Sequence, residues 1–203
     1  MPLSQFRLIL SGITDLTPEV CDAIYEAGCD DAGLAMSEGV AFLEFDREAG
    51  SFREALLSAV ADVETAGHGI QVVRVEPDEF VTISRIAERA GRTRENIRQL
   101  VVGLRDPGRF PPPIGKLNGR PGRSTPIWRW TDVARWLRDA GLLAEEAQPA
   151  AETLARGTLI AALNALLEAR RHVGSPNEVT ELCELLLEPR RFRQRLKRTA
   201  PQR

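Results

Sequence analysis

The stretch TISRIAERAGRTRENIRQL, residues 82–100, decides how the middle of this chain folds. Thr82 can cap a first helix over residues 83–90, which carry apolar side chains at helical spacing. Gly91 interrupts the pattern, as a tight turn requires. Thr93 is typical of a residue that caps a helix N-terminus, so a second helix is expected over residues 94–102. Two short helices joined by a turn that contains glycine form a helix-turn-helix.

The second helix carries side chains that suit DNA. Arg and Gln or Asn can make paired hydrogen bonds to the edges of guanine and adenine. Their position opposite the apolar face is what a recognition helix needs, although the same residues also suit a solvated helix face. The candidate DNA-contacting residues of this stretch are Arg92, Thr93, Arg94, Glu95, Asn96, Arg98 and Gln99.

A Gly- and Pro-rich segment, RFPPPIGKLNGRPGRSTPIWRW (residues 109–130), follows the helices. Its prolines force extended backbone, and Asn118-Gly119 is a hairpin signal, so the segment predicts a β-wing. Four basic residues are spread along the wing and are candidate DNA contacts: Lys116, Arg120, Arg123 and Arg129. Its tip would carry Arg120 and Arg123 towards phosphate or the minor groove.

A third helix is expected after the wing, capped by Thr131. Trp128 and Trp136 are expected in the core, since a small winged domain needs large apolar side chains. Trp130 could be either a core residue or a platform on which a base stacks.

The ordered set VTISRIAERAGRTRENIRQL (81–100), RFPPPI (109–114) and IWRWTDVARWL (127–137) resembles the excisionase/MerR-type winged helix-turn-helix of AlpA-like regulators. The resemblance covers about 60 residues and implies a recognition helix in the major groove with a wing on the DNA backbone. It implies that Thr93, Arg94, Glu95, Arg98 and Gln99 face DNA, and that Arg120, Arg123 and Arg129 are wing contacts. Arg92 departs from the family, which has a buried valine there, and the wing is longer than the minimal form.

Charge is divided unevenly along the chain. Residues 1–76 hold 4 Lys/Arg and 14 Asp/Glu, whereas residues 77–143 hold 13 and 7. Residues 144–188 hold 3 and 8, and residues 189–203 hold 7 and none. A basic block attracts phosphate even in a chain whose formal net charge is −2.

The residues before the basic block predict an α+β domain over residues 1–77. In chain order we expect a strand at 6–12, a helix between Thr17-Pro18 and Gly28, strands at 33–36 and 40–45, a helix between the Ser51 capping box and Gly67, and a strand at 70–76. This βαββαβ order is ferredoxin-like, a topology that by itself names no activity.

The expected domain order is thus a ferredoxin-like unit (1–77), a winged helix-turn-helix (78–143), a helical hairpin (154–188) and a disordered basic tail (189–203). The hairpin carries leucines on one side, which suits a dimer contact and equally suits packing onto the chain itself. The tail could add phosphate contacts or be a merely solvated terminus.

Catalytic and membrane signals are missing from the sequence. No phosphate-binding loop, dinucleotide fingerprint, serine-hydrolase or zinc-protease motif occurs, so we expect no enzyme, no metal and no cofactor. The three cysteines and two histidines do not have metal-ligand spacing, and the acidic pairs Asp30-Asp31 and Glu44/Asp46 are interpreted as a solvated face. No apolar run spans a bilayer and no secretory signal is present, so a cytoplasmic protein is expected.

The sequence therefore predicts a sequence-specific double-stranded DNA-binding protein, a bacterial or phage transcriptional regulator that acts as a homodimer. The alternative is a protein-interaction adaptor or antitoxin-like protein whose acidic N-terminal domain binds a partner. An effector-binding role for residues 1–76 could add to the first interpretation.

Overall fold

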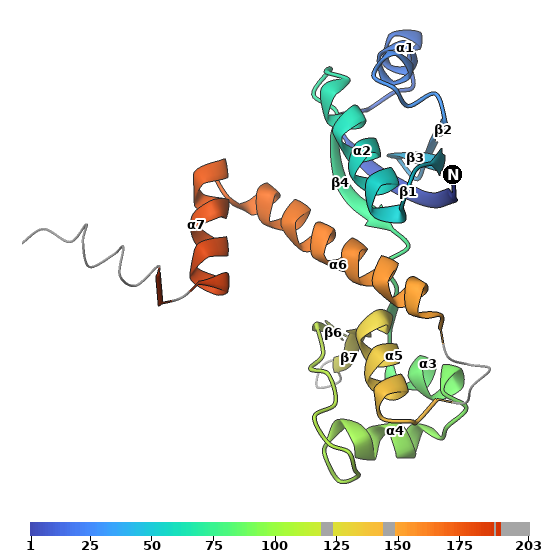
Figure 1. Cartoon of the computed structure of the whole chain (residues 1–203), viewed down its shortest axis with the longest axis vertical. Coiled ribbons are helices and arrows are strands. Elements are labelled where there is room, and N and C mark those ends of the chain that lie inside the picture. Colours follow the sequence, from blue (N-terminus) through green and yellow to red (C-terminus); the bar gives the residue numbers. More distant parts are fainter. Residues whose placement is uncertain (119–123, 144–148, 189, 192–203) are drawn as a thin grey trace, which may run out of the picture.

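The computed structural model of this protein describes residues 1–118, 124–143, 149–188 and 190–191. Within these residues the fold is mixed α+β, with seven helices and two antiparallel sheets. One group of elements surrounds each sheet, and Figure 1 shows the two groups with α6 lying across both. We call them the first unit (1–76) and the second unit (77–143).

The first unit is built from four strands and two helices. They are β1 (Leu3–Ser11), α1 (Pro18–Glu26), β2 (Ala32–Ser37), β3 (Val40–Glu48), α2 (Phe52–Thr65) and β4 (Gln71–Glu76). Thr17 and Ser51 accept hydrogen bonds from the backbone at Val20 and Glu54, as their positions in the sequence predict.

The four strands form one antiparallel sheet in the order β2-β3-β1-β4. Alternate residues of β1 and β3 are buried, so the sheet has one face in the core and one face that is open. The core includes Leu8, Leu43, Leu56 and Val72, all essentially without solvent exposure.

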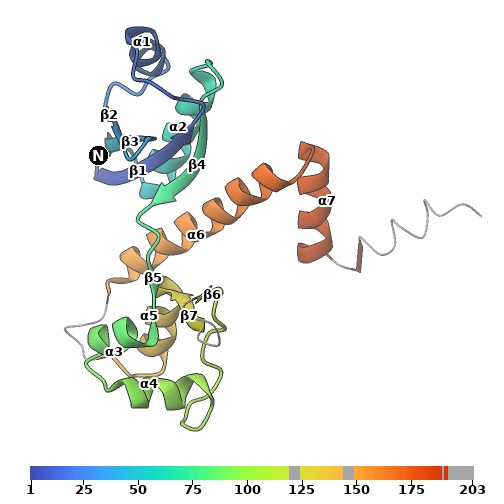
Figure 2. The same cartoon turned by 180° about the vertical axis from the view of Figure 1, so that it is seen from behind.

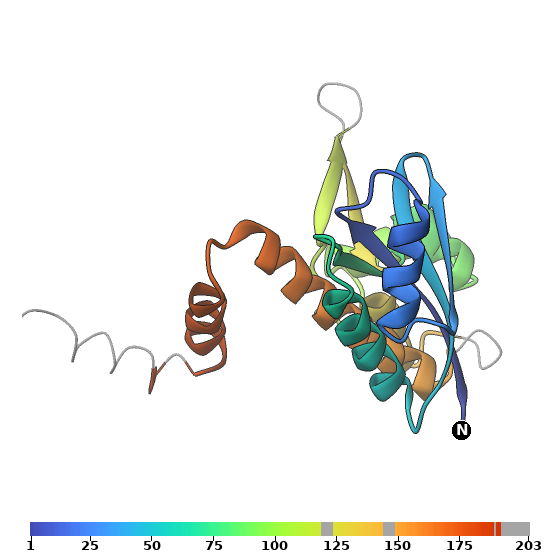
Figure 3. The same cartoon turned by 90° about the horizontal axis from the view of Figure 1, so that it is seen from above.

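The second unit holds the other sheet and three helices. Its elements are β5 (Phe80–Val81), α3 (Ile83–Arg89), α4 (Arg94–Val101), β6 (Gly115–Asn118), β7 (Ser124–Arg129) and α5 (Trp130–Asp139). The sheet order is β5-β7-β6, and the β6–β7 hairpin projects from the rest of this unit (Figure 3). The five residues 119–123, including the predicted hairpin glycine, lie outside the described residues.

Trp128 is at the centre of the second core. It is 1% exposed, and its indole N–H donates to the Pro111 carbonyl at 2.9 Å. Ile86 on α3 and Ile97 on α4 are completely buried in the same cluster, while Gly91 takes a φ of +61° in the turn between these helices. The turn thus needs the left-handed backbone that glycine adopts at low cost.

The chain ends in two further helices, α6 (Ala151–His172) and α7 (Pro176–Leu187). α6 packs against β4 and α2 of the first unit and against α5 of the second, and both Figure 2 and Figure 3 show it running past these elements. Ile160 and Leu167 enter the core of the first unit. The sequence left open whether the C-terminal helices form a dimer contact or pack onto their own chain, and α6 packs onto its own chain.

Three details differ from the sequence-based expectation. Thr131 does not cap α5, because β7 runs directly into a helix that begins at Trp130 and has Arg129 in the capping position. Thr82 precedes α3 but makes no side-chain capping bond. The two-residue strand β5 was not expected, since a pair so short has no recognisable periodicity.

Candidate nucleic-acid interface

The outward face of α4 brings four of the candidate residues together. Arg94, Glu95 and Arg98 are exposed and Gln99 is half-buried, while Ile97 and Leu100 turn the opposite side of the helix into the core. Thr93 caps this helix by accepting a hydrogen bond from the Asn96 amide at 3.1 Å. The cap places the first turn of α4 at the protein surface with its charged side chains outward.

Three of these side chains form one hydrogen-bonded network. Arg98 donates from Nε and Nη2 to the two carboxylate oxygens of Glu95 at 2.7 and 2.6 Å, and Gln99 donates to Glu95 Oε1 at 3.1 Å. These bonds, that from Arg98 above all, lower the pKa of the Glu95 carboxyl to about 2. Glu95 is therefore ionised at any pH near neutrality.

A groove of about 500 Å³ lies beside this network. Arg94, Glu95 and Arg98 form one wall, the start of α3 forms a second, and Ser124 and Thr125 of β7 form a third. Hydroxyl and guanidinium groups in such a groove can donate hydrogen bonds to phosphate oxygens. The groove thus joins the outward face of α4 to the start of β7.

Two further candidate residues, one before α4 and one within it, do not lie on its exposed face. Arg92 is half-buried, and its Nε donates to the Leu142 carbonyl at 2.9 Å, which ties the turn to the end of α5. The Arg92 guanidinium is thus engaged within the protein. Asn96 is half-buried, with a buried Oδ1 for which the described residues provide no hydrogen-bond donor.

The four basic residues predicted to lie on a wing also differ in their surroundings. Lys116 is exposed on β6. Arg129, by contrast, forms a bidentate ion pair with Asp78 at 2.8 and 3.2 Å, and the Asp78 side chain is only 4% exposed. This pairing raises the pKa of Arg129 and occupies the guanidinium edge expected to face phosphate. Arg120 and Arg123 lie outside the described residues.

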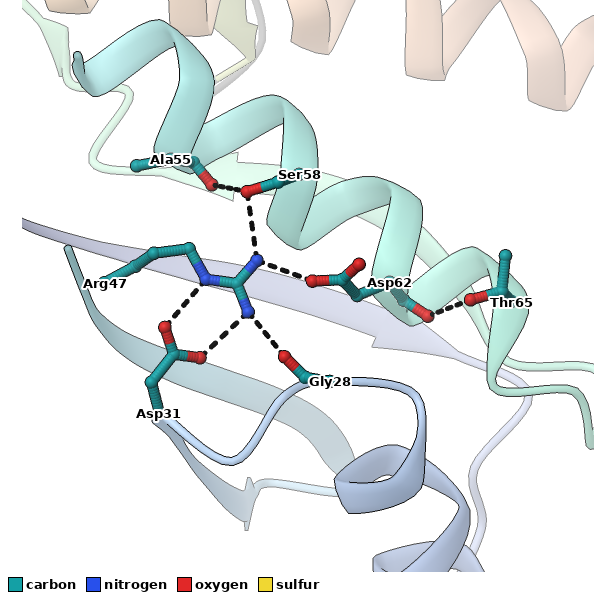
Figure 4. Close-up of polar contacts among 7 residues, drawn as sticks. All are labelled: Gly28, Asp31, Arg47, Ala55, Ser58, Asp62 and Thr65. Carbon is teal, nitrogen blue, oxygen red and sulfur yellow. Dashed lines mark hydrogen bonds and ion pairs between the residues drawn. The ribbon is translucent and has the colours of Figure 1, made fainter. Parts of the chain in front are cut away.

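The sequence interpretation missed a buried cation in the first unit. Arg47 is 7% exposed, and Figure 4 shows its guanidinium between two carboxylates, a hydroxyl and a carbonyl. All five N–H groups are used, at 2.6–3.1 Å: its acceptors are Asp31, Asp62, Ser58 and the Gly28 carbonyl. Asp31, which the sequence predicted to be a solvated acid, is therefore part of a structural clamp around Arg47. Sequence spacing gives no sign of this clamp, because its other carboxylate and its hydroxyl come from α2.

Cys29 lies next to this clamp and is buried, and burial raises the pKa of its thiol to about 11. A thiol with such a pKa remains protonated and unreactive near neutral pH. Cys21 is exposed, and Cys183 is intermediate in exposure. Within the part of the chain that the structure describes, no three His, Cys, Asp or Glu side chains are grouped to hold a metal ion.

A second groove, of about 670 Å³, lies where the open face of the first sheet meets residues 76–79. Glu44, Asp46 and Glu76 line it, and Arg7 pairs with both Glu44 and Glu76. The groove is predominantly acidic, which is consistent with the charge of residues 1–76. Its chemistry suits a basic partner and does not suit phosphate.

Comparisons with protein-family models, with curated proteins and with solved structures find no match for this chain. None of the described helices is long and apolar enough to span a membrane.

Proposed function

We propose that this protein binds double-stranded DNA in a sequence-specific manner and regulates transcription, with α4 as the recognition helix. In this proposal residues 78–143 are a winged helix-turn-helix and residues 1–77 a ferredoxin-like domain. The observation that carries the proposal is the outward face of α4, where Arg94, Arg98 and Gln99 offer base-reading donors beside the wing.

The surrounding chemistry supports this assignment. Residues 77–143 have an excess of six basic residues, 13 Lys/Arg against 7 Asp/Glu, in a chain that is acidic elsewhere. The known internal pairs of Arg92 and Arg129 reduce the basic surface of this unit, but Arg94 and Lys116 have no partner among the described residues. Free cations of this kind supply the phosphate contacts that fix register on a duplex.

We propose in addition that the protein acts as a homodimer that uses α7. Four leucines of this helix, Leu182, Leu185, Leu186 and Leu187, are between 40% and 81% exposed. One small recognition helix binds weakly alone, and a two-fold dimer would double the contacts over two half-sites. Changing Leu182 and Leu186 to Gln should then give a monomer with unchanged fold, as measured by sedimentation.

The test of DNA binding is selection from a random duplex pool with the full chain at near-physiological salt. Enrichment of a palindrome is the expected result, and its half-site spacing would report the dimer geometry. A single enriched half-site would support specific reading and overturn the dimer. Binding without enrichment, and with strong salt dependence only, would overturn specific reading.

The acidic groove of the first unit favours a second candidate function, that of a protein-interaction adaptor. Glu44, Asp46 and Glu76 on an open sheet face could receive a basic segment of a partner protein. A stable complex that is lost in a Glu44→Lys variant, in a protein that shows no DNA preference, would favour this candidate over the first.

A further inference from the structure

Glu95 is the sole acidic residue of α4 and lies at the centre of its outward face. Both of its carboxylate oxygens are engaged, by Arg98 and by Gln99. A carboxylate on a DNA-facing surface repels phosphate, so its presence there requires an explanation.

Fold stability does not provide that explanation. The side chains of Arg98 and Glu95 are 51% and 57% exposed, and exposed pairs of this kind contribute little to stability. Arg85 and Glu88 on α3 form a pair with the same spacing and similar exposure, 52% and 66%. That pair is joined by one hydrogen bond, of 2.7 Å, whereas Glu95 accepts three hydrogen bonds from two side chains.

The geometry of the network leaves the terminal edge of the Arg98 guanidinium available for hydrogen bonds to a base. Arg98 gives its Nε side to Glu95, and no described residue uses its Nη1. The two terminal nitrogens of an arginine form the fork that bonds guanine O6 and N7. Glu95 retains lone pairs that could accept from the N4 amino group of a cytosine.

We propose that Glu95, Arg98 and Gln99 act as one reading unit, in which Arg98 bonds a guanine and Glu95 selects a neighbouring cytosine. This inference rests on the proposed function and names the base class that α4 reads. Glu95 is then the specificity-determining residue: it holds the Arg98 fork in position and rejects bases that present an acceptor to it. Its negative charge lowers affinity for random duplex and so increases discrimination.

The test compares the full-length protein with Glu95→Gln and with the matched control Glu88→Gln. Both variants remove one carboxylate from an exposed Arg–Glu pair with i,i+3 spacing in the same unit. Each protein is used to select from a random duplex pool, and its affinity is then measured for duplexes that differ at the selected base pair.

For Glu95→Gln we expect the selected cytosine to change to adenine, because a glutamine side chain bonds adenine N6 and N7. Discrimination for cytosine at that position should fall roughly ten-fold or more. Binding to random duplex should strengthen, with a salt dependence steeper by about one unit, because Arg98 becomes free to contact phosphate. Glu88→Gln should leave the selected sequence unchanged.

An unchanged selected sequence in Glu95→Gln overturns the inference while leaving the proposed function in place. The same change of base preference in both variants also overturns it, because the effect would then follow net charge alone. If the unmodified protein enriches no sequence at all, the proposed function fails, and the reading unit fails with it.

Discussion

Arg47 and Glu95 form comparable charge clusters with different consequences, because one is buried and the other is exposed. Arg47 joins β3 to α2 and to the loop before β2, with every N–H group bonded. A buried guanidinium that lost these partners would be strongly destabilising. Glu95 accepts three hydrogen bonds from two neighbours, but it is exposed and water competes for the same atoms.

We expect Arg47→Lys to destabilise the protein by about 2 kcal/mol, since one ammonium group cannot satisfy both carboxylates, Ser58 and the Gly28 carbonyl. Urea unfolding measures the difference. Arg7→Lys is the control: Arg7 is 40% exposed and also pairs with two carboxylates, so its replacement should cost less than about 1 kcal/mol. Equal losses in the two variants would contradict the clamp.

The carboxyl of Glu95 should remain ionised in acid until about pH 2, because Arg98 and Gln99 hydrogen-bond its charged form. A lowered pKa means that the pair stabilises the folded state above the ordinary pKa of about 4.5 and loses this contribution as the pH falls towards 2. Side-chain NMR titration measures the midpoint. In Arg98→Ala the midpoint should rise towards 4.5, and an unmoved midpoint would show that Arg98 is not the cause.

At the scale of elements, the contact between α5 and α6 depends on a glycine. A Cβ atom on Gly157 would lie 2.4 Å from Thr131 Oγ1 and 3.1 Å from its Cγ2. The absence of a side chain thus lets the two helices approach, and the Thr131 side chain, once expected to be a cap, occupies the contact instead.

We expect Gly157→Ala to destabilise the protein by about 1 kcal/mol, because crowding at Thr131 outweighs the gain in helix propensity. In a Thr131→Ala background the same change should stabilise by about 0.5–1 kcal/mol, since the obstruction is gone. Thermal unfolding of the four proteins in this cycle measures both effects. The same sign in both backgrounds would contradict close contact at this position.

At the scale of the whole molecule, α6 connects the two units through the outer edge of β4. The Asn164 side chain accepts from the Val75 amide at 2.7 Å, donates to the Val75 carbonyl at 2.9 Å and donates to Asp78 at 3.1 Å. Asp78 in turn pairs with Arg129 at the end of β7. In the same way, Glu64 accepts from the Val72 amide and Arg170 donates to the Val72 carbonyl. Side chains therefore bond backbone groups of the edge strand β4 that would otherwise be exposed.

Removing the Asn164 side chain should open this edge locally. In Asn164→Ala we expect the Val75 amide to exchange with solvent at least about ten-fold faster, because its acceptor is lost. The Val72 amide, bonded to Glu64 at 2.9 Å, is the internal control and should be unaffected. Equal acceleration at both amides would indicate that α6 detaches as a whole, contrary to the burial of Ile160 and Leu167.

The sequence by itself determined most of the helices and strands and many of the residues that they bury. Capping and periodicity act within a few residues, so local spacing and residue type predict several features correctly. These features are the capping residues Thr17, Ser51 and Thr93, the turn at Gly91 and the buried Trp128. The outward position of Arg94, Glu95, Arg98 and Gln99 follows from the same helical period.

Only the tertiary structure decided which polar side chains remain available. Three residues were candidates on residue type alone: Arg92, Asn96 and Arg129. Arg92 donates to the Leu142 carbonyl and Arg129 pairs with Asp78. Asn96 has its Oδ1 buried. Their partners or surroundings depend on contacts between elements, and Arg92 and Arg129 each meet a partner about 50 residues away. The same holds for Arg47 and for Asn164, because ion pairs and hydrogen bonds between distant elements leave no periodic signal in the chain.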